Sequence, residues 1–172
     1  MPHIDLINPD HADGEADKLF KTAIQYFGSV PEPLQLFANN PLVANHVFNG
    51  FGPSMAQSNL SQPFFAWIRY LLASHTSCRH CIDVNGVMLM DMGVSHDKLD
   101  AARQDVSTVD LEEREKALLV ACIKVVRDQQ LLEKEDIDDL KKLGHSDADL
   151  ITAFHHAAHS HAVDMMINAF GL

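Results

Sequence analysis

Hydrophobic residues recur at helical spacing along nearly the whole chain. The first such segment begins near Asp13 and ends at Gly28, and its apolar positions fall at i, i+3, i+4, i+7, i+8 and i+11. These positions are Ala16, Leu19, Phe20, Ala23, Ile24 and Phe27. Gly28 follows directly, where helices commonly end in a glycine with a positive φ angle. No segment has the apolar–polar alternation that predicts a β-strand.

Turn-forming residues divide the remainder of the chain into further helices. Prolines at positions 31, 33, 41 and 53 indicate short helices between about 32 and 60. Longer helices are predicted at about 62–76, 78–92, 95–105, 110–128 and 133–143, and from 146 nearly to the C-terminus. Asp110 with Glu113, and Ser146 with Asp149, have the spacing of a helix-starting capping box. We therefore predict an all-α bundle of about eight helices, with residues 1–172 forming a single domain.

The charge of the chain bears on which partners it can have. Thirteen Lys and Arg residues stand against 24 Asp and Glu residues, so the formal net charge is -11. Such a surface repels phosphate backbones and anionic headgroups, so neither nucleic acid nor membrane is expected as a partner. No apolar run approaches the roughly 18 to 20 residues of a membrane span. The N-terminal residues lack the basic and apolar segments of a signal peptide, so we expect a cytoplasmic location.

Two of the three cysteines, Cys78 and Cys81, are three residues apart at the predicted start of a helix. This spacing places both sulfurs on one helix face, close enough to form a disulfide or to bind one metal ion. Backbone N–H groups and the helix dipole stabilise a thiolate at such a position, and Arg79 and His80 add positive potential. The pair therefore indicates redox or metal chemistry, although two buried structural cysteines would give the same pattern. Cys122 lies in an apolar segment and is expected to be a buried hydrophobic residue.

Short motifs accompany the CxxC over most of the chain. In order they are DGEA at 13–16, FGSVP at 27–31, ANNP at 38–41, LLA at 71–73, GVS at 93–95, EERE at 112–115 and LGHSD at 143–147. With the CxxC at 78–81, this series resembles peroxidase-related members of the carboxymuconolactone decarboxylase and alkylhydroperoxidase D-like superfamily. The resemblance implies an alkylhydroperoxidase D-like helical bundle with the CxxC at the start of a central helix, and it implies a homo-oligomer. Lactone decarboxylation is not expected, because the lactone decarboxylases of this superfamily generally lack a redox CxxC.

The resemblance also implies roles for the residues around the CxxC. In alkylhydroperoxidase D-like proteins the second cysteine attacks a hydroperoxide, and the first then forms a disulfide that a dithiol partner reduces, with no cofactor required. Cys81 would thus be the attacking thiol and Cys78 the resolving thiol. The family relays protons through a histidine inside the CxxC, a histidine four residues after it, and an acid about three helical turns before it. His80 matches the first position, but Asn85 and Ala66 occupy the other two.

Other histidines are candidates to replace the missing base. His75 lies three residues before Cys78 on an apolar helix face, and His161 shares a face of the last helix with apolar residues and with Asn168. We predict that His161 faces the interior, with Asn168, Asp164 or a CxxC cysteine as its hydrogen-bond partner. The same assignment of helix faces predicts that His155 and His156 are largely exposed.

These observations support three readings of the function. The first is a thiol–disulfide redox protein that reduces a hydroperoxide or a partner disulfide through Cys81, Cys78 and His80, with His75, His161 or Asn85 as replacement base or orienting group. The second is a metal-binding protein in which Cys78, Cys81, His80 and His161 hold an ion such as zinc. The third is an oligomeric family member without catalytic activity.

Overall fold

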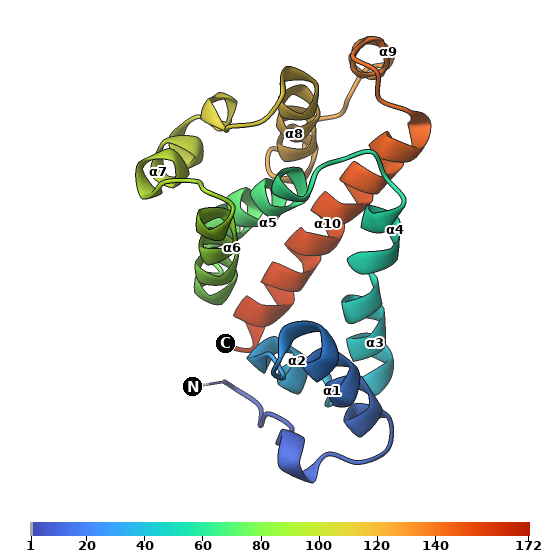
Figure 1. Ribbon diagram of the computed structural model, residues 1–172, viewed down its shortest axis with the longest axis vertical. Coiled ribbons are helices and arrows are strands. Elements are labelled where there is room, and N and C mark those ends of the chain that lie inside the picture. Colours follow the sequence, from blue (N-terminus) through green and yellow to red (C-terminus); the bar gives the residue numbers. More distant parts are fainter. Residues whose placement is uncertain (1) are drawn as a thin grey trace.

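The computed structural model describes residues 2–172, except for the side chains at positions 26, 53 and 54, and no β-strand occurs within this range (Figure 1). The α-helices are α1 (Gly14–Phe27), α2 (Glu32–Phe37), α3 (Pro41–Asn49), α4 (Gly52–Ala56), α5 (Gln62–Thr76), α6 (Arg79–Asp91), α7 (His96–Gln104), α8 (Glu113–Val126), α9 (Lys134–Lys142) and α10 (Asp147–Ala169). Two short 3-10 helices lie at Pro9–His11 and Val106–Thr108. The predicted all-α fold class is confirmed. None of the helices in the described range is long and apolar enough to cross a membrane.

Most of the predicted helix ends agree with the structure. Gly28 ends α1 in the left-handed conformation, with φ at 75°. Ser146 and Asp149 form the predicted capping box at the start of α10. The predicted start of the 110–128 helix is wrong, because α8 begins at Glu113, and Asp110 instead pairs with the Lys98 ammonium group.

Helix α5 is the centre of the fold. Nine of its fifteen residues are buried, and they lie on all sides of the helix. It packs against α6, α8 and α10, and α10 crosses the molecule from α9 to the region of α1 and α2 (Figure 1). A second, smaller apolar cluster joins residues of α1, α2 and α3 to Cys78, Cys81 and Ile167. The CxxC therefore lies where this N-terminal group of helices meets α5, α6 and α10.

Two buried carboxylates hold the chain that enters α5. Glu115 on α8 accepts hydrogen bonds from the Ser61 backbone N–H, at 2.7 Å, and from the Ser61 hydroxyl, at 2.6 Å. Asp149 on α10 accepts a bond from the Asn59 backbone N–H at 3.1 Å. Because buried acceptors are costly to leave unpaired, these bonds fix the start of α5 relative to α8 and α10.

The predicted interior face of α10 is wrong by about one residue. Ile151 is 72% exposed and Met165 is 57% exposed, whereas His156, which was predicted to be exposed, is fully buried. The buried face consists of Asp149, Leu150, Ala153, His156, Ala157, Ser160, Asp164 and Ile167. His155 is exposed as predicted, and His161 is half-buried. Asp149, His156 and Asp164 lie inward because residues outside α10 form hydrogen bonds with them.

Candidate thiol site and its cavity

The two cysteines lie at the junction between α5 and α6. Ser77 adopts a left-handed conformation, with φ at 57°, and turns the chain out of α5. Cys78 is then the N-cap of α6, and its backbone N–H donates to the Ala73 carbonyl at 3.1 Å. Cys78 and Cys81 form a disulfide with their Cα atoms 5.3 Å apart. The prediction that the pair lies within disulfide reach is confirmed.

A cavity of about 790 Å³ opens beside this disulfide. Cys81, His80 and Asn85, all on α6, contribute to its wall, whereas Cys78 does not. Most of the wall is apolar, and its aromatic part consists of Phe27, Phe37, Phe48 and Phe51. The volume is in the range of sites that enclose a small organic molecule. Cys81 is therefore the sulfur that a molecule in the cavity can reach.

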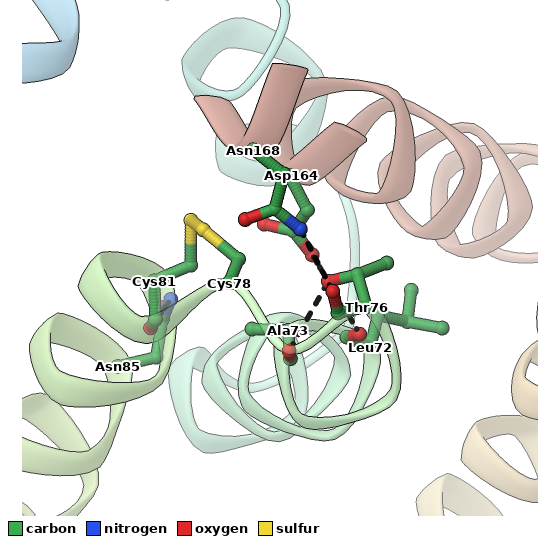
Figure 2. The surroundings of a disulfide bond; sticks show 8 residues. All are labelled: Leu72, Ala73, Thr76, Cys78, Cys81, Asn85, Asp164 and Asn168. Carbon is green, nitrogen blue, oxygen red and sulfur yellow. Dashed lines mark hydrogen bonds between the residues drawn. A yellow bond between two sulfur atoms is a disulfide. The ribbon is translucent and has the colours of Figure 1, made fainter. Parts of the chain in front are cut away.

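A carboxylate lies beside the sulfurs, and it comes from α10 rather than α5. An oxygen of Asp164 and the two sulfurs all lie within 4.8 Å of one another. Figure 2 shows Asp164 reaching from α10 toward the disulfide. Burial raises the pKa of Asp164 to about 7, while a hydrogen bond from the Thr76 hydroxyl, at 3.4 Å, acts in the opposite direction. Such a group can exchange a proton near neutral pH. The expected acid position, Ala66, is fully buried on α5 and holds no polar group.

Arg69, on α5, supplies a positive charge to the same cavity. Its Nε donates to Asn85 Oδ1 at 2.7 Å, its Nη2 donates to Met88 Sδ at 3.1 Å, and its Nη1 lies 3.2 Å from His156 Nε2. Burial lowers the pKa of Arg69 to about 10, so the guanidinium is charged at neutral pH. Burial, together with the Arg69 charge, lowers the pKa of His156 to about 3, so this ring is neutral and Nε2 accepts the bond.

Asn85 connects Arg69 to the CxxC. Its amide Nδ2 donates to the Cys81 carbonyl at 2.8 Å, one helical turn back on α6, while its Oδ1 accepts from Arg69. Both polar atoms of the Asn85 side chain are therefore occupied. Asn85 has a fixed orientation and acts as a connector, which agrees with an orienting group better than with a base.

The other histidines considered from the sequence differ in position. His80 is half-buried in the cavity wall, whereas neither His75 nor His161 is part of that wall. His75 is exposed and stacks on His161, with ring centroids 6.3 Å apart. The predicted hydrogen-bond partner of His161 is wrong, because its Nδ1 is buried with no partner within the described residues. Asn168 is exposed and donates instead to the Thr76 carbonyl at 2.7 Å.

Sequence reasoning missed Asp164 and Arg69 as members of the site. For both residues, the sequence contains a pattern that could have indicated them. Asp164 ends a polar series on α10, with Asp149, His156 and Ser160, at i, i+7, i+11 and i+15, which is a helical stripe. Arg69 is the one residue of type Asp, Glu, Lys or Arg in the apolar α5 segment. A charge among the buried residues in the middle of a helix is unusual, and Arg69 lies there because its side chain reaches the wall of the cavity.

Comparison with known proteins assigns the fold. A peroxidase-related protein from Silicibacter sp. TM1040 is 20% identical, with a TM-score of 0.84 over 99% of this chain and 90% of that one. An alkylhydroperoxidase core protein from Ralstonia eutropha JMP134, also peroxidase-related, is 17% identical, with a TM-score of 0.84 over 99% of this chain and 90% of that one. No protein-family model matches the chain, and no curated protein is significantly similar to it in sequence.

A third similar structure is that of the debrominase Bmp8. It is 20% identical, with a TM-score of 0.72 over 96% of this chain and 88% of that one. A cysteine-to-alanine variant of that debrominase has been solved in complex with 2,3,4-tribromopyrrole, with a TM-score of 0.71. Together these structures show that the chain has the fold of alkylhydroperoxidase D-like proteins.

Proposed function

Starting from the alkylhydroperoxidase D-like fold, we propose that the protein is a thiol–disulfide oxidoreductase that reduces an organic hydroperoxide at Cys81. The observation that carries this proposal is the unequal position of the two sulfurs, because Cys81 lines the cavity and Cys78 does not. An apolar cavity with an aromatic wall suits a small organic peroxide better than a protein disulfide, which would need an open surface.

The proposed reaction has three steps. The Cys81 thiolate attacks the terminal oxygen of the hydroperoxide, the O–O bond breaks, and the alkoxide takes up a proton and leaves as an alcohol. Cys81 is now a sulfenic acid. Cys78 attacks its sulfur, which forms the disulfide and releases water. An external dithiol then reduces the disulfide and is itself oxidised to a disulfide.

Asp164 is the proposed proton carrier for the first step. Its carboxylate lies within 4.8 Å of the sulfurs, and its pKa is raised to about 7 by burial. It can accept the Cys81 proton and return it to the leaving alkoxide. General acid–base help of this kind is usually worth about 10²- to 10⁴-fold in rate. His80, also in the cavity wall, remains the family-like candidate to share this role.

Counting thiols tests the proposal directly. Fully reduced protein should titrate three thiols after denaturation, one for each cysteine in the chain. After one equivalent of cumene hydroperoxide, only the Cys122 thiol should remain, and a dithiol should restore the other two. Three thiols remaining after peroxide would contradict the proposal and would favour the reading without catalytic activity.

A metal centre is the second candidate function, and a specific observation favours it. When reduced, Cys78 and Cys81 would present two thiolates next to the Asp164 carboxylate, all within 4.8 Å. Two sulfurs and an oxygen suit zinc. His80 and His161, which the sequence suggested as ligands, are not part of this group of close atoms. Metal analysis of the same reduced sample separates the candidates, because one equivalent of bound zinc that protects both thiols from peroxide would favour the metal centre.

A halogenated aromatic is a further candidate substrate for the same thiol pair. The debrominase of the same fold binds a bromopyrrole, and the cavity beside Cys81 has an aromatic wall. Transfer of bromine from carbon to the Cys81 sulfur, followed by attack of Cys78 and release of bromide, would leave the same disulfide, with a proton added to the ring carbon. The thiol count is repeated with a bromopyrrole in place of the peroxide. Loss of two thiols together with release of one bromide would identify this activity.

We also propose that the chain forms a homo-oligomer through the outer face of α10. Ile151 and Met165 are 72% and 57% exposed, and Ala158 and Ala162 between them are exposed small residues that allow close helix packing. Met165→Glu should therefore lower the molar mass measured by light scattering after size-exclusion chromatography. A wild-type protein that elutes as a monomer would contradict this proposal.

A further inference from the structure

Arg69 is a charged group in the wall of an apolar cavity, and it forms no ion pair with a carboxylate of the described residues. No carboxylate among the described residues lies within ion-pair distance of its guanidinium. Its three hydrogen-bond partners are the Asn85 amide oxygen, the neutral His156 ring and the Met88 sulfur. Each of these accepts a bond, but none of them neutralises the charge. A cation held in an apolar site normally requires a compensating anion.

The guanidinium also has donors to spare. It carries five N–H groups, and the three partners take up one on each nitrogen, so each terminal nitrogen keeps one N–H. The guanidinium is a planar fork that lines the cavity, and it can donate from both terminal nitrogens to the two oxygens of a carboxylate. The fork is held in place, because Asn85 and His156 are both buried and hydrogen-bonded to it.

The position of the fork relative to Cys81 sets the geometry of a ligand. Arg69 bonds to Asn85, which lies one helical turn after Cys81 on α6, a separation of roughly 5 to 6 Å between Cβ atoms. Arg69, Asn85 and Cys81 all contribute to the wall of the cavity. A molecule bound by Arg69 thus has its body among apolar side chains and a reactive group near the Cys81 sulfur.

We propose that the substrate is a carboxylate-bearing apolar molecule, and that Arg69 binds its carboxylate. This inference rests on the proposed function for the reacting group at Cys81, but the recognition itself does not require turnover. Asp164 also lines the cavity, and its carboxylate would oppose an anion when ionised. The fit is therefore best at a pH where Asp164 is protonated.

Binding to the oxidised protein tests the recognition without any chemistry. The probes are 4-isopropylbenzoate and its neutral amide, 4-isopropylbenzamide, compared by calorimetry at pH 6. The carboxylate should bind about 10- to 100-fold more tightly, the range expected for a charge-assisted hydrogen-bonded pair. Arg69→Met should lose this preference, whereas Arg127→Met, which removes a charge that is paired with Asp128 outside the cavity, should keep it.

Equal binding of the two probes to the wild type, or an undiminished preference in Arg69→Met, would overturn the assignment. If Arg69→Met does not fold, Arg69→Lys carries the test. Its single ammonium group should recover only part of the preference, because it cannot present the fork, and a full preference would overturn the assignment too.

A second pair of compounds separates this inference from the proposed function. Cumene hydroperoxide and its para-carboxylate derivative have the same peroxide group and differ in charge. The wild type should reduce the carboxylate compound with a KM about 10- to 100-fold lower, and Arg69→Met should abolish the difference. Reduction of both compounds with equal KM would sink the carboxylate inference alone. Reduction of neither, with the binding preference intact, would sink the proposed function alone.

Discussion

Replacing Cys81 by serine should abolish thiol-dependent hydroperoxide reduction, while replacing Cys78 by serine should stop the reaction after one turnover. The two variants differ because Cys81 lines the cavity, whereas Cys78 is fully buried and does not contribute to the cavity wall. A serine hydroxyl is not ionised at neutral pH and is a far weaker nucleophile than a thiolate, so the expected loss for Cys81→Ser is at least about 10³-fold. This is the largest effect that we expect from a single substitution.

The two variants give different chemical products. In Cys78→Ser, one equivalent of peroxide should leave a sulfenic acid on Cys81, which a dimedone adduct detects by mass spectrometry. Cys81→Ser should give no adduct. Cys122→Ala is the matched control and should turn over normally, because Cys122 is fully buried in the core and burial raises the pKa of its thiol. Full activity in Cys81→Ser, or the adduct in that variant alone, would contradict the assignment.

Asp164→Asn should make the protein more stable at pH 8 and less active. Burial raises the pKa of Asp164 to about 7 in the folded state, from about 3.9 in an unfolded chain. A raised carboxyl pKa means that the folded state holds its proton more tightly, so this stability is complete below about pH 4 and is lost as the pH rises to 7. At pH 8 the wild type therefore bears a cost of up to about 4 kcal/mol, which the neutral asparagine avoids.

Urea unfolding of the oxidised proteins at pH 8, 6 and 4.5 measures this effect. The gain in free energy of unfolding for Asp164→Asn should be largest at pH 8 and should shrink toward pH 4. Asp138→Asn is the matched control, because the Asp138 side chain is 43% exposed and its hydrogen bond to Lys134 lowers its pKa, so no gain is expected. If Asp164→Asn is no more stable than the wild type at pH 8, then Asp164 is not a buried carboxyl as described.

The same variant reports on catalysis. Loss of the proton carrier should lower kcat/KM for a hydroperoxide by about 10²- to 10⁴-fold. In the wild type, kcat/KM should rise with pH through about 7, as Asp164 becomes ionised, and this rise should be absent in Asp164→Asn. A retained rise through pH 7 would assign the titrating group to another residue.

The local pattern of the chain was enough to predict the helices and the thiol pair. Apolar spacing located α1, α5 and α10, and Gly28 and Ser146 marked helix ends, because both signals depend on residues close in sequence. The CxxC was also predictable, since residues three apart at a helix start must lie within disulfide reach whatever surrounds them. Motifs along the chain indicated the alkylhydroperoxidase D-like fold, which the similar structures show.

Only the tertiary structure decided which distant side chains complete the site. The sequence suggested His161 as a replacement base and showed Ala66 at the family's acid position on α5, yet the carboxylate at the sulfurs is Asp164 on α10 and a positive charge in the cavity comes from Arg69. The reason is that apolar residues alone do not determine the buried face of a helix. Ile151 and Met165 point outward, while His156 and Asp164 lie inward because Arg69 and Thr76, far away in sequence, pair with them. Such pairings depend on how α5 and α10 cross, which no local pattern records.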